Sequence, residues 1–289
     1  MFGIISAIYS SFFLGLGEAS LKKSYKEFEP SVAFFLDSLL GLVIWIPVAL
    51  YFGVNLNHFW EVLGFAALSA ILSEALYFYA LSKGQLSVTT ILIGSYPIYT
   101  IIFSYFINGE RLTQQQFIFI AMVIAGTLFS YLPSKFTFAE LKKTGAIFWP
   151  VIAAIGIGLS DTLSKGVIDR TADFTFLFAL ALVQIPVALV YLRIEKQSPV
   201  KSLIGAFKES EKYKHAIIGS LFAVIGTGLL WVSFSQTLAS IASPITATSG
   251  VIVVLLAIIF MDEKITVKNV VAMLLVFIGI MGISLVSGG

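Results

Sequence analysis

The chain has 289 residues, of which 58% are hydrophobic and only 12% are charged. An ordinary soluble domain carries about twice that charged fraction, so the composition excludes this class of protein. The formal net charge is +2 and the chain has no basic block, so nothing indicates a nucleic-acid partner. The chain has no cysteine, which excludes disulfides and thiolate metal sites.

Apolar runs of about 20 residues recur along the chain and predict ten transmembrane helices. They cover roughly residues 2–22, 32–53, 59–81, 86–107, 115–132, 146–168, 174–192, 215–236, 243–261 and 268–286. The first run is interpreted as a retained span, because neither a basic leader nor a small-residue cleavage site comes before Lys22. The longest polar connection is 193–214. We therefore expect an all-α integral membrane protein.

Three sequence anchors occur twice in the same order, which indicates an internal duplication. The pairs are Glu110-Arg111-Leu112-Thr113 with Glu263-Lys264-Ile265-Thr266, the run 45–50 with 184–189, and Gly15 to Glu18 plus Lys22 with Gly158 to Asp161 plus Lys165. The sequence thus predicts an N-terminal five-helix repeat over 1–132, a connecting segment over 133–145 and a C-terminal five-helix repeat over 146–289. Because five is odd, the second repeat must enter the membrane from the opposite side, so the two repeats are inverted.

The distribution of basic residues predicts the orientation of the chain. Lysine and arginine gather in cytoplasmic loops. Fifteen of the eighteen basic residues lie in the connections after the odd-numbered spans, and three, Arg111, Lys165 and Arg170, lie on the other face. We therefore expect both termini outside the cytoplasm, in a prokaryotic inner (plasma) membrane.

Two inverted five-helix repeats, each with Glu-Arg/Lys-hydrophobic-Thr before a glycine-bearing last helix, resemble the drug/metabolite transporter superfamily. Within it the chain is most similar to the EamA-type exporters with ten helices. The resemblance covers essentially the whole chain. It implies export of small metabolites, a central cavity lined by helices 1–4 and 6–9, and peripheral helices 5 and 10. Many relatives keep both termini in the cytoplasm, and the charge distribution here argues for the reverse.

Charged side chains within the spans are candidates for function, because an ionised group at the bilayer centre costs on the order of 3 kcal/mol. They are Glu18, Asp37, Glu74, Asp161 and Lys165, which we assign to ion coupling or gating. Depth along the spans, at about 1.5 Å per residue, places the first three near the cytoplasmic mouth and Asp161 on the outer side. The alternative for Glu18–Lys22 and Asp161–Lys165 is a local i,i+4 ion pair.

Aromatic and amide side chains at mid-depth are candidates for lining a substrate cavity, since amphipathic tips suit a mixed ligand. They are Trp45, Tyr77, Tyr96, Tyr99, Gln184 and Trp231. Packing or an interfacial belt is the alternative for each aromatic. Glu110 and Glu263, with Thr113 and Thr266, are expected to cap helices 5 and 10.

These patterns favour a secondary transporter that exports amino acids or amphipathic amines by alternating access, with one repeat rocking against the other. Proton or other ion coupling is left open, as is the oligomeric state. The sequence predicts no cofactor, no metal site and no catalytic residue. The alternatives are an intramembrane enzyme, for which Gly158-Leu159-Ser160-Asp161 lacks a catalytic base, and a membrane receptor or scaffold without transport.

Overall fold

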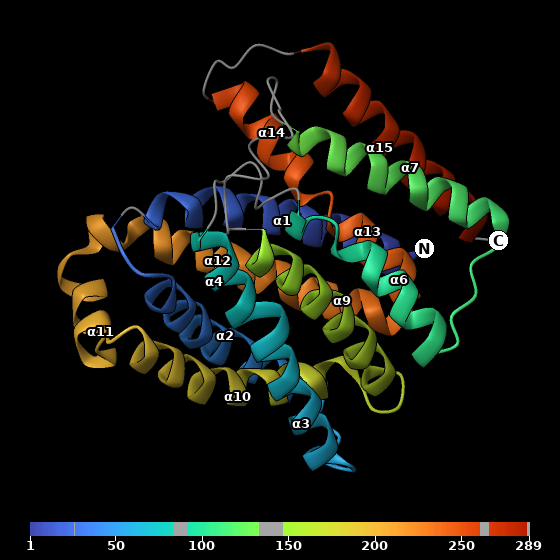
Figure 1. The fold of residues 1–289 in the computed structure, drawn as a ribbon. Coiled ribbons are helices and arrows are strands. Elements are labelled where there is room, and N and C mark those ends of the chain that lie inside the picture. Colours follow the sequence, from blue (N-terminus) through green and yellow to red (C-terminus); the bar gives the residue numbers. More distant parts are fainter. Residues whose placement is uncertain (26, 84–91, 133–146, 261–265, 288–289) are drawn as a thin grey trace.

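The computed structural model describes residues 1–25, 27–83, 92–132, 147–260 and 266–287, and within them every regular element is a helix (Figure 1). The first half contains α1 (Phe2–Ser24), α2 (Pro30–Phe52), α3 (Phe59–Ser69), the π-helical turn η1 (Ala70–Ala75), α4 (Leu76–Lys83), α6 (Tyr96–Ile107) and α7 (Gln114–Tyr131). The second half contains α9 (Phe148–Ile168), α10 (Asp173–Ile194), α11 (Pro199–Lys208), α12 (Ser210–Gln236), α13 (Ala239–Thr246), α14 (Ser249–Phe260) and α15 (Val267–Ser287).

Seven helices among the described residues are long and apolar enough to cross a membrane, with α3, η1 and α4 forming one of them. Three shorter apolar helical segments, Tyr96–Ile107, Gln114–Ser130 and Ala239–Val253, lie where the sequence predicts spans 4, 5 and 9. The expectation of an all-α membrane protein is confirmed. The predicted connection 133–145 and the second copy of the glutamate motif, Glu263 to Ile265, lie outside the described residues.

Two of the predicted spans are not continuous helices. Residues 94 and 95 interrupt the fourth predicted span just before α6, and residues 247 and 248 separate α13 from α14 in the ninth. A proline near each interruption, Pro97 and Pro244, removes one backbone donor from the helical ladder. The hydropathy averaged over a whole span does not reveal such a break.

The polar connection between α10 and α12 contains a helix that hydropathy did not predict. The Ser198 side chain accepts a hydrogen bond from the Lys201 N–H at 3.4 Å, and Pro199 occupies the first helical position. Both features favour the start of a helix. In Figure 1, α11 lies across the ends of α2, α10 and α12 and not along them.

Close packing joins helices from different halves of the chain. α1 packs along α12, and hydroxyls that donate to backbone carbonyls of the other helix line this contact. Ser6 Oγ donates to the Leu229 carbonyl at 2.7 Å, Ser10 Oγ to Gly226 at 2.7 Å and Ser233 Oγ to Gly3 at 2.7 Å. In the corresponding place, α9 packs against α3, η1 and α4. Such backbone-directed bonds suit helices surrounded by lipid.

The remaining long helices pair as α2 with α10 and α7 with α15. α7 and α15 lie side by side at one edge of the molecule (Figure 1), where their outer faces expose large apolar residues such as Phe117, Phe277 and Leu285. This arrangement matches the peripheral position that the family resemblance implies for helices 5 and 10.

Both threonines of the repeated motif cap helices as expected. Thr113 forms a capping box with Gln116 at the start of α7, and Thr266 Oγ1 accepts from the Asn269 N–H at 3.2 Å at the start of α15. The expectation for Glu110 is wrong. Its carboxylate caps α13 in the other half of the chain, where it accepts hydrogen bonds from Ala239 N at 2.9 Å and Ser240 N at 2.9 Å.

Candidate functional site

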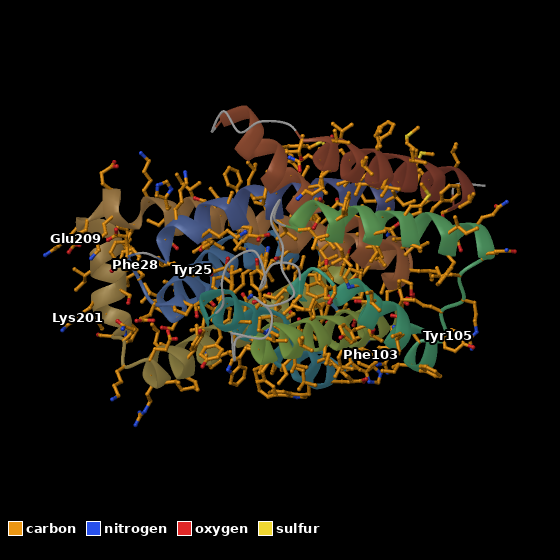
Figure 2. The ribbon with its side chains drawn as sticks, turned by 45° about the horizontal axis from the view of Figure 1, so that its top comes forward. Tyr25, Phe28, Phe103, Tyr105, Lys201 and Glu209 are labelled. Atoms are coloured by element: carbon orange, nitrogen blue, oxygen red, sulfur yellow. The ribbon has the colours of Figure 1, made fainter. Side chains whose placement is uncertain are left out.

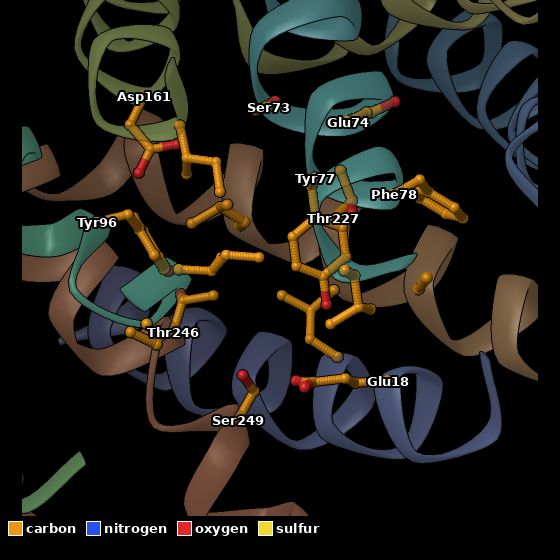
Figure 3. Close-up of a pocket in the computed structure, with 18 of the residues that line it drawn as sticks. Glu18, Ser73, Glu74, Tyr77, Phe78, Tyr96, Asp161, Thr227, Thr246 and Ser249 are labelled. Carbon is orange, nitrogen blue, oxygen red and sulfur yellow. The ribbon is translucent and has the colours of Figure 1, made fainter. Parts of the chain in front are cut away.

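A central cavity lies between helices of both halves of the chain (Figure 3). Its volume is about 150 Å³. Side chains from α1, α2, η1, α4, α9 and α12, together with the two helix interruptions, line it.

Four of the predicted intramembrane carboxylates line this cavity: Glu18, Asp37, Glu74 and Asp161. The sequence places Asp161 on the outer side of the membrane midplane and the other three carboxylates on the cytoplasmic side. In the structure, one cavity extends to all four. Of these four carboxylates, only Glu18 forms a salt bridge among the described residues, with Lys22 at 2.9 Å. The described lining thus contains four carboxyl groups and no lysine or arginine side chain.

Asp161 does not form the predicted i,i+4 pair with Lys165. Its Oδ2 accepts hydrogen bonds from Ser243 Oγ at 2.5 Å and from Thr100 Oγ1 at 3.3 Å, and Lys165 pairs with Asp169 instead. Lys165 is not among the residues that line the cavity. Asp169 lies at the end of α9, so the lysine reaches towards the helix terminus and leaves Asp161 to hydroxyl donors.

Glu74 lies in the π-helical turn η1, which widens the third long helix at the cavity. π turns occur frequently at functional sites. The carboxylate accepts a hydrogen bond from the Gln184 side-chain amide of α10. Gln184 is fully buried behind Glu74 and does not itself line the cavity. The predicted mid-membrane amide thus positions a carboxylate that the cavity exposes.

Three buried polar atoms of cavity-lining residues have no hydrogen-bond partner among the described residues. They are Asp37 Oδ1, Trp231 Nε1 and Thr246 Oγ1. All three side chains are less than a tenth exposed. A buried polar group without a partner costs about 1–3 kcal/mol, so each of these atoms carries an energetic cost in this structure.

The two helix interruptions have the same local structure and lie on the same cavity. Ser95 Oγ donates to the Leu92 carbonyl at 2.6 Å, and Thr248 Oγ1 donates to the Ile245 carbonyl at 2.6 Å. These positions differ by the same sequence offset that separates Glu110 from Glu263. The starts of α6 and α14, at Tyr96 and Ser249, both line the cavity (Figure 3). Helix N-termini carry partial positive charge, which complements the carboxylates.

The other predicted cavity residues divide into two groups. Tyr77, Tyr96 and Trp231 line the cavity. Trp45 and Tyr99 do not: Trp45 is buried and its Nε1 donates to the Val224 carbonyl of α12 at 3.2 Å, and Tyr99 packs against Gly158 of α9.

Sequence reasoning missed the hydroxyls that complete the site. Ser243 bonds to Asp161, and Thr227 and Thr246 line the cavity. A signal was present, because Ser240, Ser243 and Thr246 recur every three residues in an apolar segment. Among the described residues, no group of three His, Asp or Glu side chains lies close enough together to hold a metal ion.

Known proteins share both the sequence pattern and the fold. The profile of the EamA-like transporter family matches residues 1–132 and 144–285. An uncharacterised protein of Methanocaldococcus jannaschii is 26% identical over 140 residues, which are 48% of this chain and 96% of that protein. A crystal structure titled only as that of a protein aligns over 99% of both chains with a TM-score of 0.71 and 15% identity, which supports the fold alone. Because the family match spans nearly the whole sequence, the chain belongs to the EamA-like transporter family.

Proposed function

We propose that this protein is a secondary transporter that exports small cationic or zwitterionic metabolites, such as amino acids or amphipathic amines, by alternating access. The observation that carries the proposal is the central cavity, which Glu18, Asp37, Glu74 and Asp161 reach from both halves of the chain. The proposal also places ten membrane crossings in two inverted repeats, over 1–132 and 146–289, joined by 133–145.

Matched packing supports the inverted repeats. α1 of the first half packs on α12, and its counterpart α9 packs on α3, η1 and α4. The interruptions at 94–95 and 247–248 occupy equivalent places in the two halves. Transporters built from inverted repeats bind substrate near the midplane at interrupted helices.

The ligand chemistry follows from the charge and polarity of the lining. Asp37 and Glu74 would hold an ammonium group, because neither has a basic partner in the part of the chain that the structure describes. Trp231 Nε1, Thr246 Oγ1 and the start of α14 would hold an electronegative group. The apolar lining, including Leu14, would contact the body of the ligand.

The interruptions supply points at which the transport cycle can bend the protein. A chain that lacks continuous helical hydrogen bonding at 94–95 and 247–248 can change direction there at small energetic cost. Tyr96 and Ser249 are the first residues after the two breaks, so bending would move them at the cavity.

We propose that one carboxylate exchanges a proton for substrate. We also propose that the protein lies in the prokaryotic inner membrane with both termini outside the cytoplasm.

The alternative of an intramembrane enzyme finds little support at the serine that suggested it. Ser160 is buried, its hydroxyl donates to Ser69 Oγ at 2.9 Å, and it does not line the cavity. A receptor or scaffold without transport remains a distinct class. A flux assay separates it from a transporter.

The test is transport in proteoliposomes, with ligands first selected from metabolite pools by thermal stabilisation of the purified protein. Asp37→Asn and Glu74→Gln preserve shape and remove charge. We expect each to reduce uptake of a cationic ligand at least tenfold, since a charge-assisted contact contributes about 1.5–3 kcal/mol, and to flatten the pH dependence of transport.

The matched control is Glu61→Gln. Glu61 forms an exposed ion pair with Arg170 at 2.9 Å, outside the cavity. Its substitution should leave flux unchanged. Unaltered transport and pH dependence in both cavity variants would refute the assigned ligand chemistry, and absence of flux for every stabilising ligand would refute transport itself.

A further inference from the structure

The short helix α11 has an apolar face that no other part of the described chain covers. Val200, Leu203, Ile204 and Phe207 are 63%, 40%, 47% and 80% exposed. Their spacing of i, i+3, i+4 and i+7 places them within an arc of about 100° on the helix. At ten residues, or about 15 Å, α11 is too short to span a bilayer.

The opposite face of α11 packs on the bundle. Ser202 and Gly205 are buried there, about 180° from the apolar arc. A Cβ added at Gly205 would lie 2.5 Å from Tyr213 Oη and 2.8 Å from Tyr213 Cε2 of α12, so a larger residue would displace this ring. Since Ser202 and Gly205 face the bundle, the four apolar side chains on the other side of α11 point away from the protein.

Basic residues border the apolar face. Lys201 and Lys208 fall about 20° apart, on one edge between the apolar arc and the bundle. The whole connection 193–214 has six basic and three acidic residues, a surplus of three positive charges. Figure 2 shows Lys201 and Glu209 at this end of the molecule, near Tyr25 and Phe28 of the α1–α2 connection.

A polar cavity beside α11 also has more basic than acidic residues in its lining. Lys196, Lys201 and Lys212 line it together with the acids Glu27 and Glu29. The helix also lies across the ends of the membrane-spanning helices and not along them (Figure 1), as a helix in the plane of the membrane surface does. An apolar face with a lysine edge is the pattern of a helix that lies in the lipid headgroup region.

We propose that α11 is an interfacial helix that inserts Val200, Leu203, Ile204 and Phe207 into the surrounding bilayer and binds anionic lipid headgroups through Lys201 and Lys208. The occupant is the anionic headgroup layer of the membrane in which the protein lies. Charge complementarity favours this occupant over a second copy of the chain, whose same connection would carry the same positive surplus. The proposal stands independently of the transported ligand.

The absence of cysteine makes site-specific labelling direct. Phe207→Cys and Leu203→Cys would each carry an environment-sensitive fluorophore in nanodiscs of phosphatidylcholine with or without phosphatidylglycerol. We expect blue-shifted emission and quenching by lipids brominated near the headgroup when phosphatidylglycerol is present. Asn57→Cys, at an exposed position in the connection between α2 and α3 and outside α11, should keep the emission of a water-exposed label.

Substitution of the two lysines tests the contact with lipid headgroups. A lysine near an anionic surface contributes about a fivefold change in partitioning. The Lys201→Gln and Lys208→Gln variants, each with the Phe207→Cys label, should each need about fivefold more anionic lipid for half-maximal quenching. Lys23→Gln, which removes an exposed charge outside α11, should not.

Three results would overturn the proposal. A Phe207 label that remains water-exposed in every lipid would show that α11 does not insert into the bilayer. Burial of the label that depends on protein concentration would identify a second copy of the chain as the occupant. Equal burial of the label in neutral and anionic lipid would show that α11 does not bind anionic headgroups.

Discussion

Glu110 joins the two halves of the chain at the start of α13, and its substitution gives a quantitative test of that contact. The carboxylate is 8% exposed and accepts hydrogen bonds from Ala239 N, Ser240 N and, at 2.5 Å, Ser240 Oγ. In Glu110→Gln the amide nitrogen replaces one acceptor oxygen and faces a donor. One lost bond to a charged group costs about 1.5–3 kcal/mol, and loss of the negative charge at a helix N-terminus adds about 0.3–1 kcal/mol.

The expected loss is therefore about 2–4 kcal/mol, or roughly 3–7 °C in the apparent melting temperature of a chain of this size. Thermal unfolding of the purified protein in one detergent, followed by intrinsic fluorescence, measures it. Glu61→Gln removes a carboxylate from an exposed ion pair, which contributes less than about 1 kcal/mol. A melting temperature for Glu110→Gln no lower than that of Glu61→Gln would show that the contact with α13 does not stabilise the fold.

Two further substitutions test helix contacts by the same unfolding assay. Gly158→Ala should lower stability by about 1–3 kcal/mol, because the new Cβ would lie 2.6 Å from Tyr99 Cβ and 2.8 Å from the Thr100 backbone nitrogen. Gly64→Ala, with nothing within 4 Å, should be neutral or stabilising by up to about 1 kcal/mol, and equal effects of the two would contradict the close approach of α9 and α6. Thr113→Ala should cost about 1 kcal/mol through loss of the α7 capping box, whereas Thr113→Ser should retain most of it; equal losses would argue against the cap.

The long helices could be predicted from the sequence because length and apolar content decide membrane insertion. The helix interruptions could not, since residues 94–95 and 247–248 lie within apolar runs whose average hydropathy hides them. Pro97 and Pro244 were local signals of a break, although a proline inside a span, as in α2 and α10, is also compatible with a continuous helix. The helix α11 had a readable signal in Ser198, Pro199 and the apolar spacing that follows.

The cavity carboxylates could be identified from their type alone, because charge inside a span needs a reason. Their partners could not. Lys165 could reach either Asp161 or Asp169 at the same i,i+4 spacing, and only the structure shows that it pairs with Asp169. The partner of Glu110 is 129 residues distant along the chain, beyond the reach of any local motif.

The hydroxyl-to-carbonyl bonds along α1 and α12 have a topological consequence. α1 lies in the first of the two proposed repeats and α12 in the second, so a rigid body that preserves these bonds contains sequence from both proposed repeats. The contact of α9 with α3 imposes the same exchange on the other side. Cleaving the backbone between residues 132 and 147 would accordingly leave two fragments interlocked in one particle, and the bodies that move in the proposed transport cycle would not coincide with the two proposed repeats.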